Sequence, residues 1–329
     1  MSTLPRHGSF LPPENRMAKS TSRTRGRILS RLTVAALAAA LVGTTAGAAQ
    51  AGEIPFRERT AELKSVSPAP QNAPQNAARG VARAAEEGVR QELYAFAGPK
   101  FYWYTPDGKG GYQARDTKNN TTWGTLKFLT HTDRDFDGYT DGIWEWHTDG
   151  SLYYQDDLGG RRVGGGWKIY NTLFSPGNLG GAAGYDVLAR DASGVLWLYL
   201  GYGDGNLTAR TKVGSGWGQY TQITGRGDIS GDGKADIVAR DRSGTLWLYQ
   251  GTGDRKAPFK GRTKIGGGWN TYNTLVGTGD LDFDGITDLV ARDTKGALWR
   301  YSGTGNPAVP YNQRVKIGTS GWNQYRIIA

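Results

Sequence analysis

Three short segments of the chain carry oxygen-bearing side chains at alternate positions around a glycine. Two of them read Asp-x-Asp-x-Asp-Gly-x-x-Asp, and the third has Ser in place of the second Asp. In each segment, the residue after the glycine would add its backbone carbonyl. The predicted ligands are Asp133, Asp135, Asp137, Tyr139 and Asp141; Asp228, Ser230, Asp232, Lys234 and Asp236; and Asp280, Asp282, Asp284, Ile286 and Asp288.

Such loops favour a hard cation, because alternate side chains of a tight turn converge on one point. Calcium takes six to eight oxygen ligands and tolerates irregular shells. Without a cation, the crowded carboxylates would repel one another. Solvated aspartates that merely form turns are the alternative. Since three loops recur at the same phase of a repeat, the sequence predicts three Ca²⁺ sites.

The first half of each segment resembles an EF-hand loop, but Asp closes it at the ninth position and an apolar strand follows. A fourth copy has Asn178, Gly180 and Ala182 at the ligand positions and keeps only Asp186. We therefore predict no metal in that loop.

The elements that would carry these loops recur along the chain from residue 92. A Gly-Trp pair recurs at Trp167, Trp217, Trp269 and Trp322, with a looser relative at Trp123. These five tryptophans are 44, 50, 52 and 53 residues apart. A period near fifty, built from short aromatic strands and glycine turns, is typical of β-propeller blades.

Four units are complete, and a fifth is divided between the two ends of the repeat region. Residues 323–329 would form its first strand, and residues 92–115 its other three. The sequence thus predicts an all-β, five-bladed β-propeller whose C-terminal strand joins the N-terminal strands and closes the ring.

The N-terminal part has a different composition. Basic residues precede an apolar run at 32–42 and a small-x-small site at 49–51, as in an export signal. A membrane anchor is the alternative, and Met1 and Met17 are both possible starts. We expect an N-terminal extension with signal peptide at 1–51, a disordered linker at 52–91 rich in Pro, Gln and Asn, and a propeller at 92–329.

Charge and cysteine content narrow the function classes. The full chain has a net charge of +10, with 40 basic and 30 acidic residues. Residues 1–51 hold seven Lys or Arg and one Glu, so the remainder carries 33 − 29 = +4. We expect no nucleic-acid partner from this mixed surface. The chain has no cysteine, and its three histidines make a His-based zinc or catalytic centre improbable.

The calcium loops, followed by Asp-Ile-Val-Ala or Asp-Leu-Val-Ala, resemble the FG-GAP (VCBS) repeats of integrin α-subunits and secreted bacterial proteins. The resemblance covers residues 123–329, without the Phe-Gly and Gly-Ala-Pro flanks that name the family. Residues 264–275, together with the Leu-Tyr-x-x-x-Gly segments related to them, resemble the repeats of tachylectin-2-type lectins. This second resemblance implies a five-bladed propeller that binds N-acetylated amino sugars, and both imply a binding scaffold without enzymatic activity.

Two sets of residues are candidates for ligand binding. Trp197, Trp247 and Trp299 recur in the third strands, each with a Tyr two residues on, although packing between blades is the alternative. Trp146 and His147 break the repeat, where we align them with the pair Ala239-Arg240. The pairs Arg190-Asp191, Arg240-Asp241 and Arg292-Asp293 fit a structural role better than a ligand site.

The sequence therefore predicts a secreted, calcium-binding, lectin-like module for a glycan or a cell-surface protein. A protein-interaction scaffold in a secreted assembly is the alternative, and a hydrolase that uses the central channel ranks below both, because no nucleophile elbow or His-Glu-x-x-His motif is present. We expect no enzymatic activity, no membrane span in the mature form and a monomer.

Overall fold

The computed structural model describes residues 88–119, 121–182 and 184–329. The chain divides into two compact units, residues 1–47 and 48–329, and every described residue belongs to the second. The predicted signal peptide and residues 52–87 of the predicted linker lie outside the described residues. In the described part, no helix is long and apolar enough to cross a membrane.

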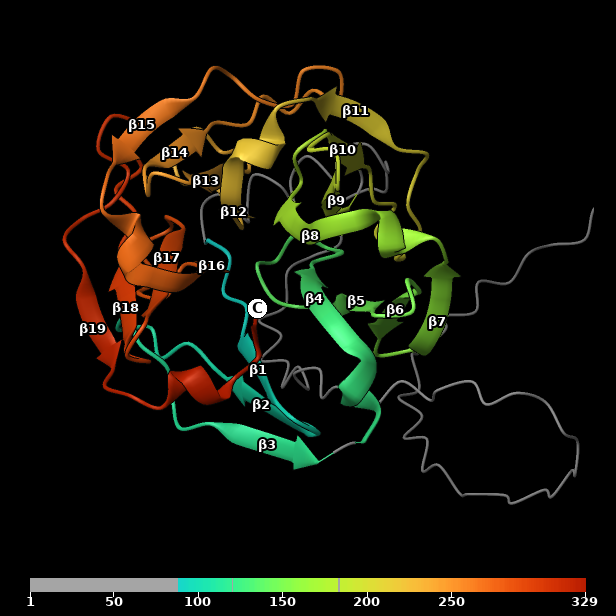
Figure 1. Cartoon of the computed structure of the whole chain (residues 1–329), viewed down its shortest axis with the longest axis horizontal. Helices are drawn as coiled ribbons and strands as arrows, with labels where there is room; N and C mark the ends of the chain where they lie inside the picture. Colours follow the sequence, from blue (N-terminus) through green and yellow to red (C-terminus); the bar gives the residue numbers. More distant parts are fainter. Residues whose placement is uncertain (1–87, 120, 183) are drawn as a thin grey trace, which may run out of the picture. The chain divides into compact units, whose positions relative to one another are not determined.

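Within the described residues, the strands form five antiparallel four-stranded sheets arranged in a ring (Figure 1). This confirms the predicted five-bladed β-propeller. From the centre outward, the first blade contains β20 (Ile327–Ile328), β1 (Leu93–Ala97), β2 (Lys100–Tyr104) and β3 (Asp116–Asn119); the second β4 (Leu126–Thr132), β5 (Gly142–His147), β6 (Leu152–Asp156) and β7 (Gly159–Gly164); the third β8 (Tyr170–Gly177), β9 (Asp186–Asp191), β10 (Leu196–Tyr199) and β11 (Thr211–Gly214); the fourth β12 (Tyr220–Thr224), β13 (Ile237–Asp241), β14 (Leu246–Tyr249) and β15 (Thr263–Gly266); and the fifth β16 (Tyr272–Gly279), β17 (Asp288–Asp293), β18 (Leu298–Tyr301) and β19 (Val315–Gly318).

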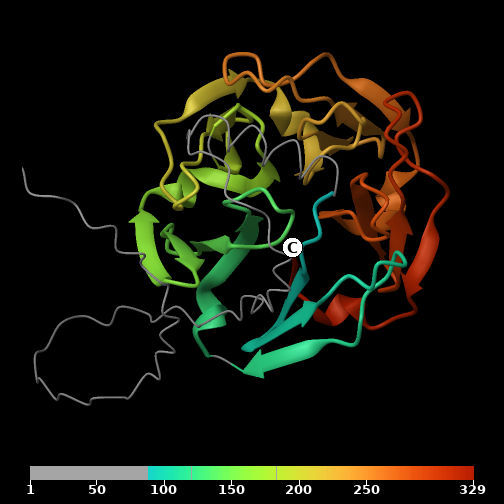
Figure 2. The ribbon, with the colours of Figure 1, turned by 180° about the vertical axis from the view of Figure 1, so that it is seen from behind.

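The ring closes as the sequence predicts. Strand β20 pairs with β1, with Ile328 opposite Ala95 and Ile327 opposite Phe96. The backbone N–H groups of Tyr94 and Ala329 each donate to the other residue's carbonyl, at 2.8 and 2.9 Å. The C-terminus lies at the centre of the ring beside β1 in both views (Figures 1 and 2). The closure pairs the open edge of β1, which stabilises the ring.

A short 3₁₀ helix begins each blade at the repeated tryptophan. These helices are η1 (Thr121–Thr125), η2 (Trp167–Ile169), η3 (Trp217–Gln219), η4 (Trp269–Thr271) and η5 (Trp322–Gln324). The glycine before η3 has a φ of 89°, which a residue with a Cβ rarely adopts. The Trp217 ring then packs on Tyr249 of the same blade, with 4.6 Å between the ring centroids. The Gly-Trp pair thus turns the chain from the outer strand of one blade into the core of the next.

Arginines at the end of the second strand link neighbouring blades. The Arg240 guanidinium donates to the carbonyls of Trp269 and Tyr272, at 3.0 and 2.5 Å. Arg190 and Arg292 make the same pair of bonds to the next blade. These contacts satisfy carbonyls at the start of each blade, which supports the structural role that the sequence favours for the Arg-Asp pairs.

Two blades lack this arginine and use a cation from the inner strand. Strand register places Phe96 and Trp146 at the position of Arg240. There, Arg326 donates to the carbonyls of Trp123 and Leu126, and Lys127 donates to the carbonyl of Tyr170 at 3.0 Å. Every pair of neighbouring blades therefore has a cation at this position, from one of two strands.

The same register corrects our alignment of the second blade. His147 lies opposite Leu126, as Asp241 lies opposite Tyr220. Trp146 and His147 therefore occupy the positions of Arg240 and Asp241, not those of Ala239 and Arg240. The sequence alignment was wrong by one residue; because the second blade has one extra residue between Asp141 and the hairpin turn, the pairing of the strands, not the spacing, fixes the correspondence.

Residues 88–91, which the sequence places in the linker, lie against the propeller. Val89 and Gln91 are buried, with 6% and 1% of their surface exposed. The Arg90 N–H donates to the carbonyl of Gly138 at 2.7 Å. The packed part of the chain therefore begins before the first strand.

Candidate metal loops and a groove beside the first blade

The acidic loops connect the inner strand of a blade to its second strand. They join β4 to β5, β12 to β13 and β16 to β17, and are named here by their first residues as the 133, 228 and 280 loops. In the 133 loop, carboxylate oxygens of Asp133, Asp135 and Asp141 lie within 4.8 Å of one another. Asp280, Asp282 and Asp288 form an equivalent cluster in the 280 loop. Each cluster could hold one metal ion.

Backbone N–H groups fix the fully buried Asp133 in the 133 loop. Its two carboxylate oxygens accept from Phe136 N at 2.6 Å and from Gly138 N at 2.7 Å. Burial and, to a smaller extent, the neighbouring carboxylates raise the pKa of Asp133 to about 8, although the Gly138 N–H lowers it. A divalent cation would favour the ionised form of Asp133. The loop thus holds this carboxylate in a fixed position, and a bound metal would offset the cost of burying its charge.

The 280 loop contains a cation of its own. Arg300 Nη1 lies 2.5 Å from Asp282 Oδ2 and 3.4 Å from Asp288 Oδ2. Burial raises the pKa of Asp288 to about 7; the Gly303 N–H and Arg300 lower it, whereas Asp282 raises it. A metal at this cluster would compete with the Arg300 guanidinium for the same two carboxylates.

The 228 loop has a different arrangement. Its Asp228 accepts from the backbone N–H groups of Gly231 and Gly233, at 2.7 and 2.6 Å. Lys260 pairs with Asp232 at 2.9 Å. Ser230 replaces a carboxylate, and this loop gives no three-carboxylate cluster among the described residues. Its predicted site stays a prediction.

The fifth-position aspartates lie outside both clusters. Asp137, Asp232 and Asp284 each accept the backbone N–H two residues on, from Tyr139, Lys234 and Ile286, at 3.1, 3.1 and 2.9 Å. The clusters are thus built from positions one, three and nine of the motif, while position five shapes the turn.

The loop without the motif keeps the turn and lacks the ligands. Asn178 accepts from Gly181 N at 2.9 Å and donates to the carbonyl of Ala182 at 2.7 Å. Asp186 accepts from the N–H groups of Leu179 and Gly180. The last aspartate of the motif therefore has a structural role here that needs no metal.

The repeated third-strand tryptophans are half-buried and engaged on two sides. The indole N–H groups of Trp197, Trp247 and Trp299 donate to Asp191, Asp241 and Asp293, at 2.8 to 2.9 Å. Arginines from the next strand lie over their rings; Arg262, for example, is 4.0 Å from the Trp247 centroid. These contacts fit packing of the blade more closely than an open ligand surface.

The residues that break the repeat in the second blade are also enclosed. Trp146 is 2% exposed, and Lys127 lies 3.6 Å from its ring centroid. His147 is 8% exposed, and its Nε2 lies 3.3 Å from the buried carboxylate of Glu145. The structure therefore encloses both candidates; Trp146 belongs to a buried cluster against which Trp197 also packs.

A groove that the sequence did not suggest lies beside the first blade. It has a volume of about 540 Å³ and is lined by β19, the residues that lead into η5, and aromatic residues of the first blade. Trp322 is half-buried here, whereas Trp167, Trp217 and Trp269 are each 7% exposed. The guanidinium of Arg115 borders the groove and donates to the hydroxyl of Tyr325 at 2.8 Å.

One sequence signal accompanies this groove. Between the outer strand and the tryptophan, this blade junction reads Gly-Thr-Ser-Gly-Trp, from Gly318 to Trp322, where the preceding three read Gly-x-Gly-Trp. The extra residue lengthens the loop at the position where Trp322 is more exposed than its equivalents. This insertion contributes to the spacing of 53 residues between Trp269 and Trp322, the longest in the repeat.

The similarity of this chain to curated proteins and to the solved structures named here is slight. No curated protein matches the sequence. Among solved structures, Prp20p from Saccharomyces cerevisiae is 11% identical, with a TM-score of 0.34 over 69% of this chain, and the match spans 61% of Prp20p. AofleA from Arthrobotrys oligospora is 9% identical, with a TM-score of 0.39 over 68% of this chain and 70% of AofleA.

The family comparison concerns the fourth and fifth blades. Residues 228–291, which include both the 228 loop and the 280 loop, match the model of the FG-GAP-like repeat family. The described part of the chain is thus a five-bladed β-propeller with FG-GAP-like repeats in its fourth and fifth blades.

Proposed function

We propose that this protein is a secreted, non-catalytic binding module that recognises a carbohydrate in the groove beside the first blade. The half-buried Trp322 carries this proposal, because its equivalents in three other blades are buried. Sugars present an apolar face to an aromatic ring and hydroxyls to polar groups. Arg115, Gln113 and Gln324 border the groove and supply such groups.

A glycan array with the purified chain tests this site. We expect binding to a defined sugar, lost in Trp322→Ala and weakened in the exposed groove variant Gln113→Ala. Trp247→Ala, at a half-buried tryptophan of the fourth blade outside the groove, is the matched control. Binding that survives Trp322→Ala in a folded protein would contradict the groove assignment.

A protein partner is the second candidate, since a propeller with FG-GAP repeats suggests a protein-interaction module. A negative array with a folded protein would favour this candidate. Cross-linking to co-secreted proteins would then identify the face that binds.

We also propose that Ca²⁺ occupies the 133 and 280 loops and stabilises the folded state by mass action. The two carboxylate clusters support this proposal. Calcium should raise the Tm by several degrees over the chelated protein, and Mg²⁺ should raise it less, because these loops form irregular oxygen shells. Identical melting curves in Ca²⁺ and chelator would refute it.

A further inference from the structure

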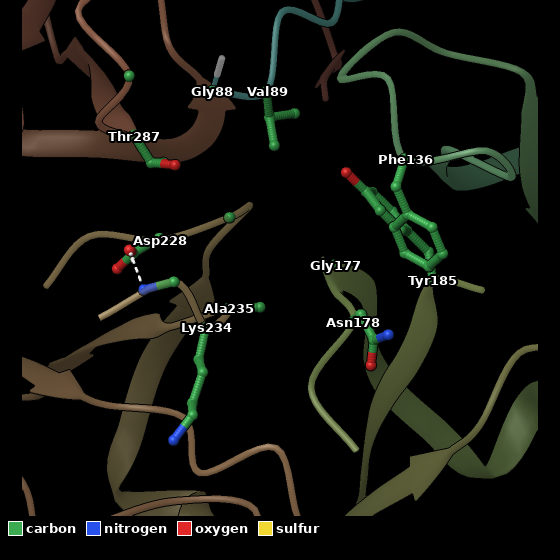
Figure 3. A pocket seen from close by; sticks show the side chains of 13 residues that line it. Gly88, Val89, Phe136, Gly177, Asn178, Tyr185, Asp228, Lys234, Ala235 and Thr287 are labelled. Carbon is green, nitrogen blue, oxygen red and sulfur yellow. Dashed lines mark hydrogen bonds between the residues drawn. The ribbon is translucent and has the colours of Figure 1, made fainter. Parts of the chain in front are cut away.

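The groove beside the first blade has a uniform charge. Arg115 and Lys316 are the charged residues that line it in the described part of the chain, both are exposed, and no Asp or Glu lines it there. The cavity beside the acidic loops, with a volume of about 60 Å³, has mixed charge, because Asp228 and Lys234 lie on one side of it (Figure 3). The groove is therefore better suited to an anionic group than this cavity.

Aromatic side chains hold the guanidinium of Arg115 at the groove. Its Nη1 donates to the Tyr325 hydroxyl at 2.8 Å, and its Cζ lies 4.8 Å from the centroid of the Tyr102 ring. The hydroxyls of Tyr325 and Tyr104 have the largest effects on the pKa of Arg115, and both raise it. A guanidinium has five N–H donors, so bonds to these two hydroxyls leave others for a ligand.

Asp116 and Asp293 lie near the groove without lining it. Asp116 pairs with Trp103, so it stands on the face of the sheet opposite to Tyr102. Burial raises the pKa of Asp293, but the Trp299 N–H, two backbone N–H groups and, least of these, the charge of Lys316 lower it. The charge of Lys316 is therefore partly offset, whereas Arg115 forms no ion pair with any described carboxylate.

The half-buried ring of Trp322 and the guanidinium of Arg115 belong to one connected group of side chains. The Trp322 ring lies on Tyr104, with 4.7 Å between the ring centroids. The Tyr104 and Tyr325 hydroxyl oxygens are 2.6 Å apart, and the Tyr325 hydroxyl accepts from Arg115. A sugar stacked on Trp322 would thus lie in the same groove as a positioned guanidinium.

The fourth blade repeats the arginine without the accessible ring. Arg262 lies 4.0 Å from the centroid of the Trp247 ring and donates to the Tyr220 hydroxyl at 2.6 Å. However, Trp217, the equivalent of Trp322, is 7% exposed. Of the five repeated tryptophans, only Trp322 is not buried. The first blade therefore combines a repeated cation with an aromatic surface that the other blades cover.

We propose that the groove selects a saccharide that carries a carboxylate, such as a uronic acid, with Arg115 as its counter-charge. This inference rests on the proposed function, since it assigns a class of sugar to the same groove. The planar guanidinium matches a carboxylate in charge and hydrogen-bonding geometry. Trp322 would contact the apolar face of the sugar ring, and Lys316 would add to the positive potential.

A glycan array that carries each uronic acid oligosaccharide beside its methyl ester tests the proposal with the purified full chain. The ester keeps the sugar ring and removes the charge. We expect binding curves in which the acids bind about tenfold more tightly than the esters, the difference expected for a charge-assisted hydrogen bond. Arg115→Met should remove this preference, and Arg115→Lys should keep part of it. Arg262→Met, at the arginine with the same contacts in the fourth blade, should leave it unchanged.

The outcomes separate this inference from the proposed function. Esters that bind as tightly as acids, with binding still lost in Trp322→Ala, would overturn the carboxylate class alone. A folded protein that binds no glycan would overturn both proposals. An acid preference that persists in folded Arg115→Met would place the counter-charge elsewhere, and tighter binding of sulfated glycans would exclude the carboxylate. If Arg115→Met does not fold, the wild-type contrast between acids and esters and the Arg115→Lys variant decide.

Discussion

The 133 and 280 loops share one motif and differ in what surrounds it. Both bring the first, third and ninth aspartates together. In the 280 loop, the guanidinium of Arg300 already pairs with two of these carboxylates. In both loops the first aspartate accepts two backbone N–H groups, but in the 133 loop burial raises its pKa to about 8. For the first aspartate of the 280 loop, Asp280, burial raises the pKa to about 6.

The aromatic residue at the fourth position differs as well. Phe136 and Phe283 have φ values of 59° and 61°, a region unfavourable for a bulky side chain. Phe136 is 4% exposed, while Phe283 is 41% exposed. The two loops thus show that a motif specifies the turn, while side chains from other strands of the same blade, such as Arg300, and from the next blade, such as Tyr185, determine its electrostatic and packing environment.

The largest expected effect is that of Asp133→Ala. The substitution leaves the N–H groups of Phe136 and Gly138 without their acceptor, so it should lower the free energy of unfolding by about 3 kcal/mol even in chelator. Asp135→Ala changes a more exposed member of the cluster and should act mainly in Ca²⁺. Urea unfolding of both variants, with and without Ca²⁺, measures the difference. If both variants lost the same free energy of unfolding in chelator, the predicted difference between the buried and the exposed ligand would be wrong.

A second test makes the same substitution in both loops. Phe136→Gly relieves the backbone strain but removes a core side chain that packs on Tyr185, so we expect a net loss of about 2 kcal/mol. Phe283→Gly removes a half-exposed ring, and the relief and loss should cancel to within about 1 kcal/mol. Thermal unfolding of the two variants compares them. A larger loss for Phe283→Gly would contradict the packing contrast.

Removal of the competing cation sharpens the comparison. Arg300→Met should raise the Ca²⁺ affinity of the 280 loop about tenfold, because Ca²⁺ would no longer have to displace the guanidinium from Asp282 and Asp288. It should leave the 133 loop unchanged. Calcium titration in an Asp135→Ala background, which silences the 133 loop, isolates this effect, with Arg162→Met as the control. Unchanged affinity would show that Arg300 does not compete.

The smallest expected effect is a difference in pH dependence. A carboxyl whose pKa is raised to about 8 holds a proton at pH 7, and Ca²⁺ must displace it. The affinity of the 133 loop should therefore fall about tenfold from pH 9 to pH 7. For the 280 loop, where the pKa of Asp288 is about 7, the fall should be about twofold. Titrations in Asp282→Ala and Asp135→Ala, each of which keeps one cluster, test this; equal slopes would contradict it.

Much of the fold was predictable because the repeat encodes it. The tryptophan spacing gives the number of blades, and the isolated strand after Trp322 gives the closure. The alignment of the pair Trp146-His147 was wrong by one residue, because the spacing after Asp141 differs from that of the other blades and only the pairing of β4 with β5 fixes the correspondence. Lys127 and Arg326 were missed as well. Each takes the place of an arginine that stands on the second strand in the other blades, and only the pairing of the strands brings these two positions together.

The functional sites divide in the same way. Local sequence determined the acidic loops, because ligands within nine residues of one turn converge whatever surrounds them. Tertiary structure decided that Arg300 reaches the 280 loop and that Trp322 is more exposed than its equivalents. These properties depend on side chains from other strands and blades, and burial and charge pairing are set by such neighbours rather than by adjacent residues.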